Sequence, residues 1–366
     1  MTSSAASINV ADQSPGPYPW ILHPVLDLLL CCGGILGLFC LLLFLAPTVF
    51  CRSSQIGQTI VIFSLITLSM PHGIASYLRV YNSAHTEKKV KVQATLLALV
   101  CAVAGWSTLV SDPAWFIFAH VTWYLGVEHL FKQSYGIALV YCYKRKYYLK
   151  KWEQKLFLFA VQMGTIHTVV AVFTGPDVRI LNRSIGPPCL PAWADEVTQI
   201  LLYVAIAAFA AVCLRKYKQE GKVFPLPAAL CMFVSYCYQG ALPFLVRDPV
   251  VAALAVSPNL HLTQYIAVTT AFHLKETGLP ENVPLSKIAS QLCRPVALKY
   301  FAFLLGAGFI TSIWIIPQVW VLGMNLGFNI QRVAVAVFMV VNVHHYLVDA
   351  LIWKQKDPDI RRLLIS

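Results

Sequence analysis

Charged residues are scarce in this chain. Asp, Glu, Lys and Arg together make up 12% of the 366 residues, whereas 58% of the residues are hydrophobic. The mean hydropathy is +0.66. A soluble globular domain carries roughly twice this share of charge, so the composition excludes that class and indicates an integral membrane protein.

Sequence motifs for nucleotide binding and hydrolysis are also missing. The chain contains no Walker loop, no GxGxxG after a strand, no GxSxG elbow and no HExxH. No long polar segment is present that could form a soluble domain for ATP or NAD. The 11 cysteines form no CxxC pair, and most lie in apolar runs, which is typical of buried thiols acting as small hydrophobic side chains.

Long apolar segments dominate what remains. They predict an all-α, polytopic transmembrane helical bundle of about ten spans, each of roughly 20 residues. Pro258 interrupts the eighth span, so a second helix is expected to start near Asn259. Pro317 and the glycines of VLGMNLGFN are expected to separate the ninth span from the tenth. A polar N-terminal segment, 1–24, precedes the transmembrane domain, 25–353, and a short basic tail, 354–366, follows it. The candidate spans are 25–49, 57–80, 93–111, 114–142, 155–174, 197–214, 224–246, 250–273, 297–316 and 328–353.

Basic residues alternate in density between successive inter-span segments. One side of the predicted bundle holds dense Lys and Arg clusters, and the other side holds isolated arginines such as Arg52 and Arg247. Cytoplasmic loops carry the excess of basic residues, so both termini are expected in the cytoplasm. The net charge of +12 is explained by these loops and does not indicate nucleic-acid binding. Residues 1–20 lack a basic n-region, so no cleavable signal peptide is expected, and we predict a bacterial cytoplasmic membrane protein.

A polar stripe runs along the last predicted span, VFMVVNVHHYLVDALIWKQK. Asn342, His345, Asp349 and Trp353 follow one another at spacings of three and four residues, which places them on one face of a helix. An ionisable residue inside a membrane span costs roughly 2.5–3.5 kcal/mol or more, so it is a candidate for a functional site.

Most of the ten histidines are expected in the cytoplasmic half of the bundle. His120, His167 and His261 are expected in the outer half. Imidazole and carboxylate ligands suit iron, zinc, copper or nickel, and a His-plus-carboxylate set with open positions is typical of non-haem iron oxygenases. Hydrogen bonding between helices is the alternative role for each histidine. The candidate metal ligands are His72, His129, His273, His344, His345 and Asp349.

The fourth span adds two candidate catalytic residues. Glu128 and Lys132 form a pair of opposite charge four residues apart, and Tyr135 continues the same helix face. We expect Glu128 and Tyr135, together with Asp349, to transfer protons or to position a substrate. A purely structural ion pair is the alternative interpretation.

The histidines, roughly one per predicted helix and without HxxHH boxes, resemble those of the bacteriorhodopsin-related carotenoid-cleaving oxygenases of bacterial membranes. His72, His129 and the His344–His345 pair carry this resemblance. More loosely, the histidine content resembles that of membrane desaturases and hydroxylases, although the chain lacks their HxxxH and HxxHH motifs. These families imply a bound metal, dioxygen and an apolar substrate.

These observations together predict a metal-dependent membrane oxidoreductase or oxygenase. The expected cofactor is a transition metal, with iron first, and the expected substrate is a membrane lipid or isoprenoid. An electron donor is the further partner that such chemistry would use. Two alternatives stay open: a proton- or ion-coupled transporter, since intramembrane His, Glu and Lys also build ion relays, and a non-catalytic membrane assembly subunit.

Overall fold

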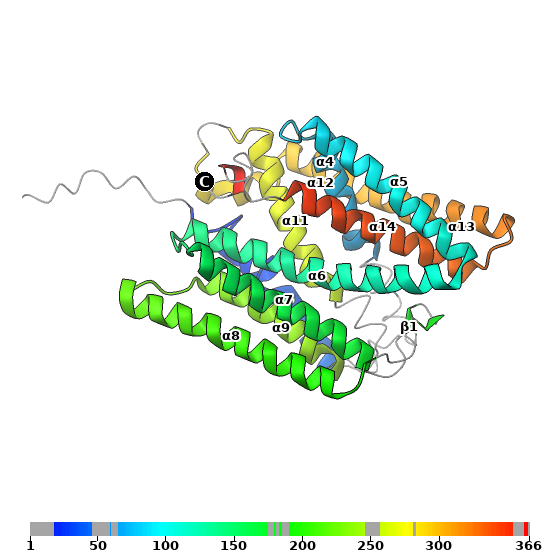
Figure 1. Cartoon of the computed structure of the whole chain (residues 1–366). Coiled ribbons are helices and arrows are strands. Elements are labelled where there is room, and N and C mark those ends of the chain that lie inside the picture. Colours follow the sequence, from blue (N-terminus) through cyan, green and yellow to red (C-terminus); the bar gives the residue numbers. More distant parts are fainter. Residues whose placement is uncertain are drawn as a thin grey trace, which may run out of the picture.

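The chain folds into a bundle of helices in the computed structural model (Figure 1). Within the described residues, only a two-residue antiparallel pair departs from helix and loop, formed by β1 (Arg179–Ile180) and β2 (Arg183–Ser184). The all-α class predicted from the composition is confirmed. Most of the predicted N-terminal segment and of the basic tail lies outside the described residues. The structure describes residues 18–45, 59, 65–174, 179–180, 183–184, 190–245, 257–280, 283–353 and 362–364.

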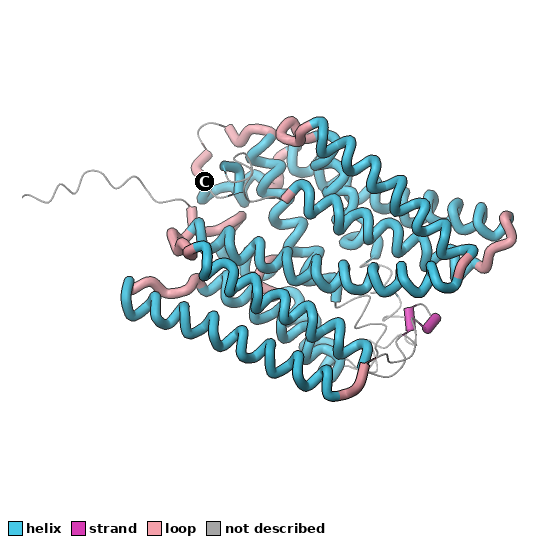
Figure 2. Tube along the Cα trace, viewed as in Figure 1, coloured by secondary structure: helices cyan, strands magenta, loops and turns pink. Residues whose placement is uncertain are grey.

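The helical elements follow the order of the predicted spans, and Figure 2 shows the loops that join them at the two ends of the bundle. In chain order they are α1 (Pro24–Leu30), α2 (Gly34–Leu45), the π-turn η2 (Leu65–Ser69), α4 (Met70–Asn82), α5 (Lys88–Val110), α6 (Asp112–Lys144), α7 (Lys151–Thr174), α8 (Trp193–Glu220), α9 (Leu226–Leu245), α11 (Ser257–Glu276), the 3₁₀ turn η4 (Leu285–Gln291), α12 (Pro295–Ile310), the π-turn η5 (Thr311–Ile315), α13 (Ile316–Asn325) and α14 (Ile330–Ile352).

Five of the described helical segments are long and apolar enough to cross a membrane. Large apolar side chains on these segments are exposed, for example Val103 (70%), Tyr203 (60%) and Trp314 (62%). Exposed apolar surface of this extent is that of a membrane protein. The five segments are α5, α7, α8, α14 and the continuous stretch Pro295–Asn325.

The first predicted span, 25–49, is divided into two helices, and the prediction of one continuous helix was wrong. Gly33 lies between α1 and α2 with a φ of +83°, and a Cβ added there would lie 2.6 Å from Val234 Cγ1. A residue with a side chain fits neither this backbone conformation nor this space, so glycine ends the first helix here.

Helix α11 satisfies the backbone groups that this break leaves free. The hydroxyl of Thr263 donates to the carbonyl oxygen of Leu30 at 2.9 Å, and the amide Nε2 of Gln264 donates to that of Cys31 at 2.9 Å. Buried carbonyl groups without partners are costly, so these two contacts stabilise the break and fix α11 against it.

Two π-turns each precede a helix that has proline as its second residue. η2 leads to Pro71, and η5 leads to Pro317. After η5, the amide of Ile316 donates to the carbonyl of Thr311, five residues back, which widens the helix where the proline ring needs space. The helix therefore continues to Asn325, so Pro317 does not end the ninth span as expected. The break before α14 lies instead in the glycine-containing segment, where Gly327 has a φ of +86°.

In the predicted eighth span, Pro258 is the second residue of α11. Proline is favoured at the start of a helix, because its fixed φ suits the first turn and its missing N–H is not needed there. The expected helix start near Asn259 is thus confirmed within about two residues. The expected short piece before it lies outside the described residues.

Helices α5 and α14 approach closely at Gly105. A Cβ at this position would lie 2.2 Å from Val340 Cγ2, closer than real side chains come. Small residues allow membrane helices to approach in this way, and this contact places α14 against α5.

The substitution Gly105→Ala is expected to reduce the free energy of unfolding by about 1–3 kcal/mol, because the added methyl group must displace Val340. Gly306→Ala in α12 is the matched control, since nothing lies within 4 Å of a Cβ there. The control should be neutral or more stable by up to about 1 kcal/mol, given the helix propensity of alanine. Thermal unfolding of both variants in one detergent measures the difference. Equal midpoints would contradict the close helix contact.

Candidate metal centre

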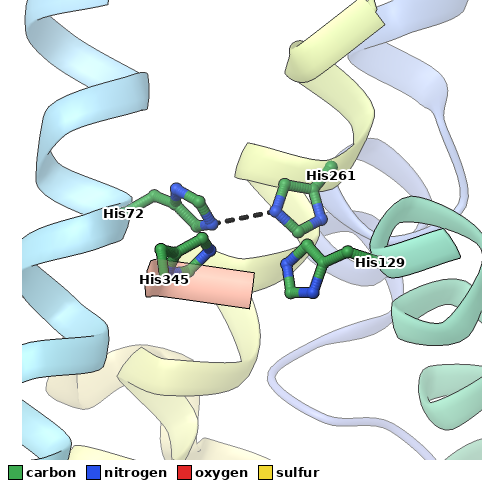
Figure 3. Close-up of side chains that lie close together, drawn as sticks. All are labelled: His72, His129, His261 and His345. Carbon is green, nitrogen blue, oxygen red and sulfur yellow. Dashed lines mark hydrogen bonds between the residues drawn. The ribbon is translucent and has the colours of Figure 1, made fainter. Parts of the chain in front are cut away.

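Four histidines from four different helices meet in the interior of the bundle (Figure 3). They are His72 of α4, His129 of α6, His261 of α11 and His345 of α14. Each offers one ligand atom, and these atoms lie within 4.8 Å of one another. We call these four residues the histidine cluster.

The spacing of the nitrogens suits one ion. The Nε2 atoms of His72 and His261 lie 2.8 Å apart. Metal–nitrogen bonds of about 2.0–2.1 Å place neighbouring ligands roughly 3 Å apart and opposite ligands roughly 4 Å apart. A single transition metal therefore requires only small movements of the four rings.

The rings are packed edge to face and mostly shielded from the surroundings. The centroids of His72 and His345 are 4.1 Å apart, and those of His129 and His261 are 4.6 Å apart. His72, His261 and His345 are buried, whereas the side chain of His129 stays 11% exposed. His129 is thus the least buried ring of the histidine cluster.

Asp349 adds a carboxylate at the edge of the histidine cluster. It follows His345 by one helical turn, and its Oδ2 lies 3.6 Å from His345 Nε2 and 3.7 Å from His129 Nε2. Both distances are close to those between ligands of one ion. The ligand atoms that all lie within 4.8 Å of one another are those of the four histidines, so Asp349 borders the histidine cluster.

Nε2 of His72 and Nε2 of His261 lie within hydrogen-bonding distance of each other, but three other buried atoms at this centre lack hydrogen-bond partners within the described part of the chain. They are Nε2 of His129, Nε2 of His345 and Oδ2 of Asp349. A buried polar atom left without a partner costs about 1–3 kcal/mol, so three such atoms in one place are unusual. A shared cation would satisfy all three at once.

The protonation state of His72 also suits a ligand. Its Nδ1 lies 3.4 Å from the carbonyl oxygen of Ser69, which can only accept a hydrogen bond. The proton therefore belongs on Nδ1, and the lone pair of Nε2 points into the histidine cluster. Histidines that bind metals commonly donate their second N–H to a carbonyl or carboxylate in this way.

His261 was expected in the outer half and was not among the predicted ligands, and the structure corrects its position. Depth was counted along helices assumed to run parallel, but α11 runs steeply across α6 and α14 (Figure 1). The second turn of α11 therefore places His261 beside His129. The sequence held one usable signal, because Pro258 marks the helix start and His261 shares a helix face with Tyr265.

Two of the predicted ligands lie away from the histidine cluster. His344 donates from Nε2 to the carbonyl of Ala94 at 2.9 Å, and its Nδ1 accepts from the hydroxyl of Tyr77 at 2.8 Å. Neighbouring residues of a helix point about 100° apart, so His344 and His345 cannot face the same ion. His273 stacks on Tyr300 with 4.3 Å between the ring centroids.

The two further catalytic candidates also make other contacts. The carboxylate of Glu128 pairs with Lys132 at 2.7 Å on a partly exposed face of α6. The hydroxyl of Tyr135 donates to the carbonyl of Gln154 at 3.4 Å, and its ring packs against Phe157. Of the predicted site residues, the structure thus brings together His72, His129, His345 and Asp349.

Comparisons with protein-family models, with curated proteins and with solved structures find no match for this chain. The arrangement of the side chains is therefore the basis for any functional inference.

Single alanine substitutions separate the histidine cluster from the other histidines. His261→Ala and His345→Ala are expected to reduce the metal content of the purified protein at least tenfold, because each removes one ligand to the ion. His344→Ala and His273→Ala, the matched controls, should keep the metal. Inductively coupled plasma mass spectrometry gives the metal-to-protein ratio. A wild-type protein with less than about a tenth of an equivalent of any transition metal would contradict the site.

Proposed function

We propose that this protein is an integral membrane, metal-dependent oxidoreductase that holds non-haem iron in the histidine cluster and acts on a lipid or isoprenoid. The observation that carries the proposal is the convergence of four buried imidazoles beside one buried carboxylate. A histidine with a purely structural role, such as His344, forms hydrogen bonds to groups of its own. It does not need three other imidazoles beside it.

The donor set favours iron over the other metals that bind histidine. It consists of imidazole nitrogens beside a carboxylate, and it would leave room at the ion for a further ligand. Histidine and carboxylate ligands with an open position are typical of non-haem iron enzymes, whereas structural zinc sites are closed and tetrahedral. When bound, the iron would supply dioxygen activation, which no side chain can perform.

The surroundings of His129 favour an apolar substrate. This ring is the most exposed of the cluster, and Tyr346 lies beside it with 4.7 Å between the ring centroids. The adjoining face of α6, which also carries Glu128, is apolar and exposed at Val121 (41%) and Ile117 (62%). In our proposal a lipid or isoprenoid reaches the metal sideways from the bilayer along this face.

The protein's own residues would bind and position the reacting molecules. Glu128 neighbours His129 in α6, and its pair with Lys132 lies on the same exposed face of the helix. We assign this pair to a polar end of the substrate or to proton exchange with it. A reaction that leaves one oxygen atom as water also consumes two electrons, so an electron donor at the cytoplasmic side belongs to the proposal.

A proton- or ion-coupled transporter is the alternative that the broken first helix would favour. Broken helices in transporters offer free carbonyl groups to ions. In this chain the carbonyl groups of Leu30 and Cys31 at the break already accept hydrogen bonds from α11. This observation places the transporter second.

The proposal is tested with the purified protein in lipid nanodiscs, loaded with Fe²⁺ without air. Exposure to dioxygen in the presence of bacterial membrane lipids and an electron donor such as dithionite-reduced ferredoxin is expected to consume oxygen and to yield oxidised lipid, detected by mass spectrometry. His345→Ala should lose at least about 90% of this rate, since it removes a ligand.

The control for this experiment is His344→Ala, which changes the neighbouring histidine and leaves the cluster intact. It should keep most of the rate. Equal rates for both variants and for the Fe²⁺-free protein would overturn the proposal. A pH gradient that collapses only in proteoliposomes with intact Glu128 and Lys132 would favour transport instead.

A further inference from the structure

We propose that Ser76, Tyr265 and Trp353 are positioning residues, which hold one tautomer of His345 and aim Asp349 at the ion. This inference rests on the proposed metal centre. Ser76 and Tyr265 are not among the predicted site residues, whereas Trp353 belongs to the polar stripe that the sequence shows in the last span. They lie on α4, on α11 and directly after α14.

A continuous chain of hydrogen bonds joins these residues to the site. Nδ1 of His345 lies 3.0 Å from the hydroxyl of Ser76, which lies 2.5 Å from the hydroxyl of Tyr265. The hydroxyl of Tyr265 donates to Oδ1 of Asp349 at 2.9 Å, and Nε1 of Trp353 donates to the same tyrosine hydroxyl at 3.2 Å. Apart from Trp353, all these residues are buried.

The direction of each hydrogen bond follows from the groups at the two ends of this row of hydrogen bonds, Asp349 and His345. An ionised carboxylate only accepts, so the single proton of the Tyr265 hydroxyl goes to Asp349. The tyrosine oxygen must then accept the proton of Ser76, because the distance of 2.5 Å requires a hydrogen bond. The alternative acceptor for Ser76, the carbonyl of His72, lies farther away at 3.5 Å.

The same order fixes the proton on His345. Since the proton of Ser76 goes to Tyr265, the Ser76 oxygen accepts from Nδ1 of His345. A neutral imidazole with its proton on Nδ1 has its lone pair on Nε2, the atom that faces Asp349 and His129. These hydrogen bonds therefore leave both Nε2 of His345 and the carboxylate of Asp349 able to bind a metal ion.

Trp353, at the end of α14, is held in place by two neighbouring side chains and donates a hydrogen bond to Tyr265. The guanidinium of Arg79 lies over its indole ring at 4.5 Å, and Phe272 packs against it edge to face at 5.9 Å. Trp353 comes one helical turn after Asp349, so its N–H reaches the hydroxyl group that holds that carboxylate. The Tyr265 hydroxyl thus has three hydrogen-bond partners, on Ser76, Asp349 and Trp353.

The test is a titration of the metal-free full chain in nanodiscs with Co²⁺, whose visible absorption reports ligand number and geometry. Tyr265→Phe and Ser76→Ala are expected to weaken Co²⁺ binding by about 10- to 100-fold and to change the absorption bands. Trp353→Phe should have a smaller effect in the same direction. Tyr300→Phe and Ser235→Ala are the matched controls, since both remove a buried hydroxyl away from the cluster and should leave affinity and spectrum unchanged.

A double-substitution cycle separates positioning from a general loss of structure. If Tyr265 acts through Asp349, then Tyr265→Phe should change Co²⁺ affinity little when Asp349→Asn is already present. Additive effects in this cycle, or wild-type affinity and spectrum for both Tyr265→Phe and Ser76→Ala, would overturn the inference and leave the metal centre standing. A wild-type protein that binds no Co²⁺ would instead reject the proposed function.

Discussion

The structure depends on how four imidazoles and a carboxylate are accommodated in an apolar interior. Each buried polar atom needs a partner, and leaving one without a partner costs about 1–3 kcal/mol. On their outer sides His72 and His345 have partners, in the Ser69 carbonyl and the Ser76 hydroxyl. On the inner side the atoms face one another at distances that suit an ion. A bound cation would satisfy these inner atoms together.

Helix α11 links this centre to the rest of the bundle. Its first half supplies His261 to the cluster and Tyr265 to Asp349, and between them Thr263 and Gln264 bind the carbonyl groups at the break between α1 and α2. The buried amide of Gln264 also accepts from Ser134 of α6. One short segment thus fixes both the break in the first helix and the position of two site residues, which couples the stability of the fold to the geometry of the centre.

Part of the candidate site was predictable from the sequence, because helical spacing alone places Asp349 one turn from His345 and on the same face. His72 and His129 were selected as ionisable residues within apolar segments, and the structure brings both into the cluster. The same reasoning selected His344 and His273. His344 instead forms hydrogen bonds with Tyr77 and Ala94, and His273 stacks on Tyr300. A sequence shows that a histidine is buried in a span, but it does not show which neighbour its ring faces.

The sequence by itself determined the class of the protein, the order of its helices and the polar stripe of the last span, because these follow from composition and from the periodicity of one helix. Tertiary structure alone decided the convergence of the histidines and the inclusion of His261. The steep path of α11 brings His261 to the depth of His129. The tilt of a helix depends on how it packs against its neighbours, here through contacts such as those of Thr263 and Gln264, and one helix's own sequence does not show this packing.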